Sequence, residues 1–382
     1  MIPTTITRIS RPLSEFDRAL VIATYFGFMP ITAPKITRQD IEMTEECGNY
    51  PHYDAAEKAS IFRTYLEQEL SSLPHPFAII YKKIASRRRF GDYALHFIGS
   101  TSGIAEATLI RAALSILSEE GYKNLRVDIN CIGDKESISI YERELANFIR
   151  KFGANLSETE KVSIKEDIFN LFRLEAPEAI RLRESAPSAI TSLTTQSRIY
   201  FKEVLEYIEA LGIEFRLAPE LVGERNHASH TIFAIRDTDE KNTLATGYRY
   251  SRLGRYFGLR KEIPMAGVNI FSLSSRAATK RVYRELPRPK FYLIQLGWEA
   301  KVKTLSLIEI LRSHKIPLYH YLGKDKIAVQ LSNAESVRVP YLLIIGQKEG
   351  LDNTVTIRNV STRAQDTVSI MNLPHYLKNI TL

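Results

Sequence analysis

Five cations surround one predicted turn in the first quarter of the sequence. Lys82 and Lys83 end the apolar run PFAIIYKK, and Arg87, Arg88 and Arg89 precede a second strand-like run, YALHFIGS. Guanidinium and ammonium groups gathered in a turn can bind phosphate oxygens. A loop of solvated charges is the equally weighted alternative.

A second segment, GYRYSRLGRYFGLRK, alternates cations with aromatic rings. Arg249, Arg252, Arg255 and Arg260 are interleaved with Tyr248, Tyr250 and Tyr256. Arginines can hold a nucleic-acid backbone while neighbouring rings stack on bases. Half-buried strands carry the same pattern, so contact with RNA is one of two interpretations.

The metal-binding residue types are arranged unfavourably for a metal site. His227 and His230 are three residues apart in a strand-like segment, so they do not share a face. Cys47 and Cys131 are far apart and form no CxxC, which predicts neither a zinc site nor a disulfide framework and fits a reducing compartment. The sequence also lacks Walker, dinucleotide-binding, HExxH and GxSxG motifs.

Composition sets the broad class. The 382 residues are 44% hydrophobic and carry a formal net charge of +8. That charge permits contact with RNA, but solvated lysines would also account for it. The sequence contains no apolar run long enough for a membrane span, and its N-terminus lacks the apolar core of a signal peptide. We therefore expect a cytoplasmic protein of two or three domains.

Periodicity and punctuation divide the chain near Pro287. Residues 1–286 form the first predicted domain, in which 37–54 is expected to be a loop and 152–200 a helical insertion or spacer. In residues 290–382, apolar strands alternate with amphipathic helices, which predicts a compact α/β domain.

The C-terminal segment YLLIIGQKEGLDNTVTIRNVSTRAQDTVSI resembles the anticodon-binding domain of the class II histidyl-tRNA synthetases. The similarity rests on an apolar strand leading to Gly346 and Glu349, on the strand at 354–358, and on the return strand at 365–369. It extends back to about Phe291.

Five segments of the N-terminal part resemble the same family in the same order. FGFMPITAPKI is similar to motif 1, which forms dimers, and IPMAGVNIFSL is similar to motif 3. LVGERNHASHTIFAIRD resembles the histidine-specific segment of the family, and LRVDINCIGDKES and ATGYRYSRL resemble two further family segments. The resemblance implies an α+β fold, with a class II aminoacyl-tRNA-synthetase-like antiparallel sheet, helices and a C-terminal α/β anticodon-binding-like domain. It also implies a homodimer.

Motif 2 departs from the family pattern. The family has Phe-Arg-x-Glu, whose arginine holds the α-phosphate of ATP and whose glutamate reads the adenine. Here the matching residues are Tyr81, Lys82, Lys83 and Ile84. Lysine lacks the bidentate fork of arginine, and isoleucine cannot accept a hydrogen bond.

Two further arginines of the family pattern are also replaced. Gly223 stands where the histidine-specific segment has an arginine, and Asn226, His227 and Ala228 replace its Asp-Tyr-Tyr. Phe271 and Ser272 replace the Glu-Arg of motif 3. Because losing one preorganised donor commonly raises a barrier by about 3–4 kcal/mol, we expect conventional histidine activation to be slowed by orders of magnitude.

The resemblance nevertheless nominates binding residues. Glu57 matches the glutamate that binds the substrate amino group, and Gly247 and Arg249 are the best-preserved pocket positions. The candidates for a substrate or nucleotide pocket are Glu57, Lys82, Lys83, Arg89, Gly247 and Arg249. The candidates for RNA binding are Arg87, Arg88, Lys348, Arg358 and Arg363. We assign no catalytic residue and no metal ligand.

Three functions fit these residues. The first is a synthetase-like protein that binds tRNA or another RNA and has lost most of its activating residues. The second is a working histidine–tRNA ligase that uses ATP and magnesium with Lys82, Lys83 and Arg87 to Arg89. The third, a histidine-sensing regulatory subunit like that of ATP phosphoribosyltransferase, ranks last because that subunit type lacks an anticodon-binding domain.

Overall fold

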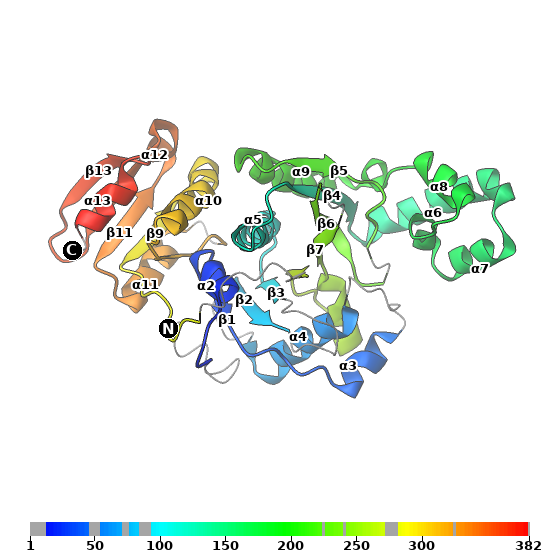
Figure 1. Ribbon diagram of the computed structural model, residues 1–382, viewed down its shortest axis with the longest axis horizontal. Coiled ribbons are helices and arrows are strands. Elements are labelled where there is room, and N and C mark those ends of the chain that lie inside the picture. Colours follow the sequence, from blue (N-terminus) through cyan, green and yellow to red (C-terminus); the bar gives the residue numbers. More distant parts are fainter. Residues whose placement is uncertain are drawn as a thin grey trace.

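The computed structural model describes residues 13–45, 54–70, 76–83, 93–223, 226–239, 242–271, 282–323 and 326–380. Two mixed sheets organise this part of the chain, an eight-stranded sheet in the N-terminal body and a five-stranded sheet in the C-terminal domain (Figure 1).

The eight-stranded sheet has the strand order β1-β2-β3-β8-β7-β6-β4-β5. Neighbouring strands are antiparallel except for the β1–β2 and β4–β5 pairs, which are parallel and lie at the two edges. The strands are β1 (Phe28–Pro30), β2 (Phe77–Lys82), β3 (Tyr93–Ile98), β4 (Leu125–Gly133), β5 (Phe215–Leu217), β6 (Ser229–Asp237), β7 (Thr243–Arg249) and β8 (Met265–Ile270). The antiparallel centre confirms the predicted sheet class.

Helices cover both faces of this sheet. One face packs on α2 (Arg18–Tyr25), α5 (Ile104–Glu119) and α9 (Thr195–Ala210) through one hydrophobic cluster. A second cluster on the other face contains residues of α4 (Ala55–Glu67) and of the 3₁₀ helix η6 (Ser251–Phe257).

The polar stretch 37–54 is not a loop throughout, as its composition predicted. Residues Arg38–Met43 form the helix α3, which begins at Thr37. Thr37 and Asp40 cap each other reciprocally, and Arg63 from α4 donates hydrogen bonds to the buried Asp40 carboxylate. These contacts stabilise a helix too short to be stable alone. Residues 46–53 lie outside the described part.

Residues 152–200 are helical, as their pattern predicted. The segment contains α7 (Glu158–Glu166), α8 (Pro177–Glu184) and short 3₁₀ turns, and it follows α6 (Lys135–Phe152). Figure 1 shows α6, α7 and α8 gathered at the end of the molecule opposite the C-terminal domain. Its description as an insertion stays a prediction.

The C-terminal domain has the strand order β10-β9-β11-β12-β13. The first three strands are parallel, and β12 and β13 form an antiparallel hairpin. Its elements are β9 (Phe291–Gln295), α10 (Trp298–Ser313), β10 (Leu318–His320), α11 (Ile327–Val337), β11 (Tyr341–Ile345), α12 (Gln347–Asp352), β12 (Thr354–Asn359), β13 (Gln365–Ser369) and α13 (Leu373–Asn379). The Gly-x-x-Glu sequence begins α12, because the Gly346 amide donates to the Glu349 carboxylate at 3.0 Å. None of the helices in the described ranges combines the length and apolar character that crossing a membrane requires.

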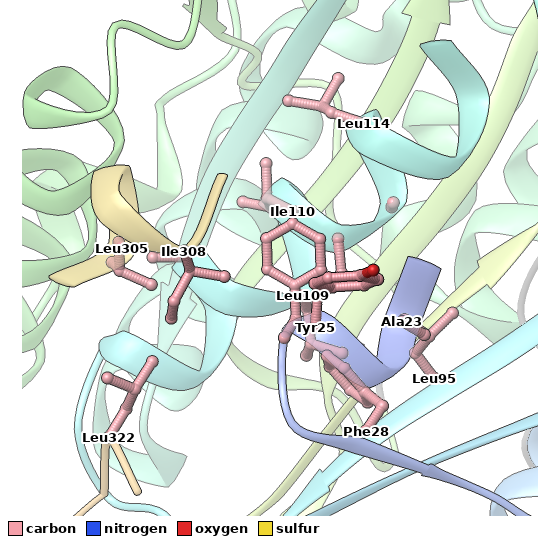
Figure 2. Close-up of a cluster of buried hydrophobic side chains, with 14 of the residues drawn as sticks. Ala23, Tyr25, Phe28, Leu95, Leu109, Ile110, Leu114, Leu305, Ile308 and Leu322 are labelled. Carbon is pink, nitrogen blue, oxygen red and sulfur yellow. The ribbon is translucent and has the colours of Figure 1, made fainter. Parts of the chain in front are cut away.

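The two domains share one hydrophobic core. Figure 2 shows Leu305 and Ile308 of α10 beside Leu109 and Ile110 of α5 and Tyr25 of α2, and all five belong to a single buried cluster.

Ion pairs border this contact. Arg312 of α10 binds Glu119 of α5 at 3.0 Å, and Arg111 of α5 binds Glu309 of α10 at 3.2 Å. Both pairs join α5 to α10, the helices whose apolar side chains meet in the shared core.

The connection after α2 passes very close to β10. Gly27 has a φ of +83°, and a Cβ built on it would lie 2.9 Å from Cε1 of His320. Nε2 of His320 donates a hydrogen bond to the Tyr25 carbonyl at 3.1 Å. A residue without a side chain is therefore required at position 27 for both backbone conformation and domain contact.

Ile308→Ala tests the shared core. We expect this change to lower the free energy of unfolding by about 2–5 kcal/mol, because it opens a cavity between the two domains. Ile308→Val should cost about 0.5–1.5 kcal/mol at the same site. Urea denaturation would measure both, and an alanine variant as stable as the valine variant would contradict a tightly packed interface.

Candidate functional site

Helix α4 places two charged residues against the eight-stranded sheet. The Asp54 side chain caps the helix by accepting a hydrogen bond from the Glu57 amide at 3.1 Å. Lys58, Phe62 and Tyr65 follow at helical spacing, so they share the buried face. Glu57 and Lys58 are only 4% and 1% exposed. Buried charges of this kind require partners.

Four donor groups of the protein itself contact the Glu57 carboxylate. Its Oε1 accepts from the Tyr81 hydroxyl at 2.7 Å. Its Oε2 lies 3.0 Å from Nδ2 of Asn269, 3.3 Å from Nζ of Lys58 and 2.7 Å from Nζ of Lys83. Three of the four donors thus converge on Oε2 and one contacts Oε1, so the protein itself supplies partners for this buried charge.

The Lys58 ammonium is held on several sides. It donates to Oδ1 of Asn269 at 2.9 Å and lies 5.9 Å from the ring centroids of both Tyr248 and Tyr250. A carboxylate, an amide oxygen and two aromatic faces are the groups that recognise an ammonium ion. Lys58 thus occupies an ammonium site built inside the fold.

A directional hydrogen-bond chain continues from Glu57 across the sheet. The Tyr81 hydroxyl donates to Glu57, so its oxygen accepts from Nε2 of His96 at 3.0 Å. Nδ1 of His96 then accepts from the Tyr250 hydroxyl at 2.8 Å. This order assigns His96 as the neutral Nε2-protonated tautomer.

The pKa shifts follow from burial and from the paired charges. Burial alone would raise the pKa of Glu57, but the ammonium groups of Lys58 and Lys83 outweigh it and lower that pKa below its usual range. Burial lowers the pKa of Lys58, and Glu57 opposes this effect. Burial also lowers the pKa of His96 well below its usual value. The cluster therefore holds an ionised carboxylate and a neutral imidazole.

Arg249 belongs to a different cluster on the opposite face of the sheet. Its Nε and Nη2 bind the Glu106 carboxylate of α5 at 2.8 and 3.0 Å, and its Nη1 donates to the Ser100 carbonyl at 2.7 Å. The Tyr200 ring of α9 lies 5.2 Å from the guanidinium carbon. Each nitrogen of this guanidinium is engaged by the fold, and Arg249 is 3% exposed.

Gly247 and Lys82 also lie away from Glu57. A Cβ at Gly247 would lie 2.2 Å from the Phe233 ring, so this glycine allows close packing within the core. Lys82 is half-exposed and pairs with Asp17 at 3.3 Å, at the start of α2.

The structure therefore brings together only two of the predicted pocket residues, Glu57 and Lys83. Lys82, Gly247 and Arg249 do not join them. Arg89 lies outside the described residues, as do the RNA-binding candidates Arg87 and Arg88 and the motif 3 position Ser272.

The remaining RNA-binding candidates lie at two ends of one sheet. Arg358 pairs in register with Leu342 near the start of β11, and exposed Arg363 lies in the turn that follows β12. Exposed Lys348 lies in α12, beyond the other end of β11.

Sequence reasoning missed most of the cluster around Glu57. Lys58 had a detectable signal, because a lysine three and four residues before Ile61 and Phe62 falls on the apolar face of the predicted helix. His96, inside a continuous apolar strand, gave a similar signal. Asn269 and Tyr250 gave none, because their partners come from distant strands.

The histidine-specific segment is packed as core. His227 is fully buried, and its Nε2 lies 2.9 Å from the Tyr248 hydroxyl. Gly223 has a φ of +64°, and a Cβ there would lie 2.7 Å from Ile232. In the described ranges, no three His, Cys, Asp or Glu side chains are grouped to hold a metal ion.

Glu57→Gln tests the buried pair. Removing the carboxylate leaves the Lys58 ammonium buried without its anion, so we expect a loss of about 3–5 kcal/mol in the free energy of unfolding. Glu158→Gln, in the exposed pair with Lys161, is the matched control and should cost less than about 1 kcal/mol.

The double variant Glu57→Gln/Lys58→Met completes the cycle. It should be more stable than Glu57→Gln alone, because no unpaired charge remains. Urea denaturation that ranks the double variant below the single one would contradict the pairing.

His227 should make stability depend on pH. Burial lowers the pKa of His227 to about 3, whereas an unfolded histidine titrates near 6.5. Between these values the unfolded state binds more protons, so stability should fall as the pH is lowered from about 6.5, by up to about 1.4 kcal/mol per unit. His227→Gln should flatten the profile measured by urea denaturation. The exposed His375→Gln should leave the profile unchanged, and equal slopes for the two variants would contradict this assignment.

The sequence of the chain is similar to those of known proteins. Residues 290–380 match the family model described as an anticodon binding domain. Over 298 residues the chain is 27% identical to the histidine–tRNA ligase of Bacillus subtilis, covering 76% of this chain and 70% of the relative. It is 27% identical over 339 residues to the histidine–tRNA ligase of Listeria monocytogenes, covering 84% and 79%.

A solved structure supports the fold. The apo histidyl-tRNA synthetase of S. aureus matches 93% of this chain and 92% of its own, with a TM-score of 0.51 and 20% identity. Sequence order, the C-terminal domain and the mixed sheet agree. The chain is therefore similar in sequence to the histidine–tRNA ligases over most of its length, and its C-terminal residues 290–380 match the anticodon binding domain.

Proposed function

We propose that this protein binds tRNA or another RNA and does not activate histidine. The observation that carries the proposal is the Glu57 carboxylate, which already binds four groups of the protein itself, Tyr81, Asn269, Lys58 and Lys83. In the family that this chain resembles, the glutamate that matches Glu57 binds the amino group of the substrate.

Lys58 supplies the ammonium that a substrate would otherwise bring. An incoming amino acid would have to displace Lys58 from Glu57 and Asn269. Displacement would leave a second cation in a site that already contains Lys83, and like charges at this distance repel strongly in a buried environment. The arrangement favours the protein's own side chain over a ligand.

The hydrogen bonds that Arg249 already makes within the protein support the same conclusion. Activation of a carboxylate by ATP depends on preorganised cations around the phosphates. The Arg249 guanidinium is already committed to Glu106 and to the Ser100 carbonyl. Its Nε and Nη2, a pair of donors suited to binding a phosphate in two places, are occupied by the Glu106 carboxylate.

RNA binding is supported by the C-terminal domain. This domain matches the anticodon binding model, and Arg358 and Arg363 lie together at one end of its hairpin in a chain of net charge +8. The homodimer and the cytoplasmic location implied by the resemblance belong to the same proposal. ATP and magnesium would take part only in the ligase alternative, which the names of the relatives favour.

Histidine-dependent exchange between ATP and pyrophosphate decides between the two functions. We expect the full chain with magnesium to show exchange at the level of a protein-free blank. Exchange that rises with histidine concentration would establish the ligase and overturn the proposal.

Filter binding with tRNA tests the RNA surface. We expect Arg358→Ala/Arg363→Ala to weaken binding and to reduce the slope of log affinity against log salt by about 0.7–0.9 for each phosphate that the variant no longer binds. Lys202→Ala, an exposed cation on α9, is the control and should bind like the unchanged protein. Unaltered affinity and slope in the double variant would show that the hairpin is not part of the RNA-binding surface.

A further inference from the structure

A cavity of about 170 Å³ lies between the two domains. Phe26, Gly27 and Met29 form its wall on the body side, next to the edge of the eight-stranded sheet. Tyr319 to Gly323 and helix α11 form the opposite wall. The cavity lies at the domain boundary, a common location for small-molecule sites, and apart from the cluster around Glu57.

Aromatic side chains dominate the lining. Phe26, Phe77 and Phe97 come from the body, and Tyr292, Tyr319 and Tyr321 come from the C-terminal domain. A protein cavity of roughly 150 Å³ holds a benzene molecule, so this volume fits one substituted ring. Rings on both walls offer face and edge contacts to a planar ligand.

One polar group in this lining, the Tyr292 hydroxyl, lacks a hydrogen bond of normal geometry. Tyr292 is 3% exposed, and its hydroxyl oxygen is buried with no hydrogen bond of normal geometry. A buried hydroxyl without a partner is destabilising unless a ligand or water meets it.

Asn333 of α11 lies close to this hydroxyl. Burial raises the pKa of Tyr292 to about 12, against a smaller lowering effect of Asn333. The hydroxyl is therefore protonated at neutral pH and can donate. Asn333 lines the same cavity, and its amide provides both a donor and an acceptor.

We propose that this cavity binds a neutral aromatic ring of the size of a substituted benzene or one nucleobase, with its polar edge toward Tyr292 and Asn333. The apolar walls disfavour a charged ring, since none of the described lining residues carries an opposite charge that would compensate for its desolvation. An acceptor on the ring satisfies the Tyr292 hydroxyl. The proposal does not rest on RNA binding, because a free small molecule would fit the site equally well.

Calorimetric titration of the full chain with benzamide and with adenine tests the site. We expect saturable binding of at least one probe. Tyr292→Phe retains the ring but removes the donor, so it should weaken binding about tenfold. Ser336→Trp places an indole at the exposed rim of the cavity and should abolish binding.

Ser332→Trp provides the matched control. Ser332 is exposed on the same helix but is not part of the lining, so this variant should bind the probes like the unchanged protein. Absence of saturable binding by both probes, or binding that Tyr292→Phe and Ser336→Trp leave unchanged, would overturn the proposal.

Competition with tRNA identifies the source of the ring. If the ring is an unstacked RNA base, saturating benzamide and Ser336→Trp should each weaken tRNA binding. If it is a free small molecule, the affinity for tRNA should be unchanged. A protein that fails to bind tRNA but binds the probes would contradict the proposed function and support the cavity.

Discussion

A carboxylate buried beneath a helix must be compensated by the fold that buries it, and the surroundings of Glu57 are organised by that requirement. Two ammonium groups, an amide and a phenol converge on this carboxylate from α4, from β2 and the residue following it, and from β8. Loss of the anion would strand Lys58 in an apolar environment. The same contacts stabilise the body and, in the proposed function, keep Lys58 at the position where an amino acid would otherwise bind.

Alternation along β7 separates the two charged clusters. Tyr248 and Tyr250 face Lys58, whereas Arg249 between them faces Glu106 on α5. Successive side chains of a strand point to opposite faces, so one strand contributes to two clusters that do not meet. The arginine that best preserved the family pattern in sequence is therefore far from the carboxylate with which it was grouped.

Periodicity predicted the architecture well because it records which face of each element is buried. The β12–β13 hairpin and the α/β character of the C-terminal domain were predictable in this way, whereas the antiparallel sheet was expected only from the family resemblance. Helix α3 was not, because its stability comes from a cap and from a distant arginine, Arg63. The composition of the candidate site was equally inaccessible, since the contact of Lys58 with Asn269 joins residues 211 positions apart. Register and strand order decide such pairs, and a single sequence does not contain them.

The close passage at Gly27 has a consequence for how the relative position of the two domains could change. The interdomain angle depends on a position that carries no side chain, where even one methyl group would press against the His320 imidazole. A larger residue at position 27 would push against His320 at the contact between the two domains, away from the core of either domain. The domain contact at His320 therefore depends on position 27 remaining glycine.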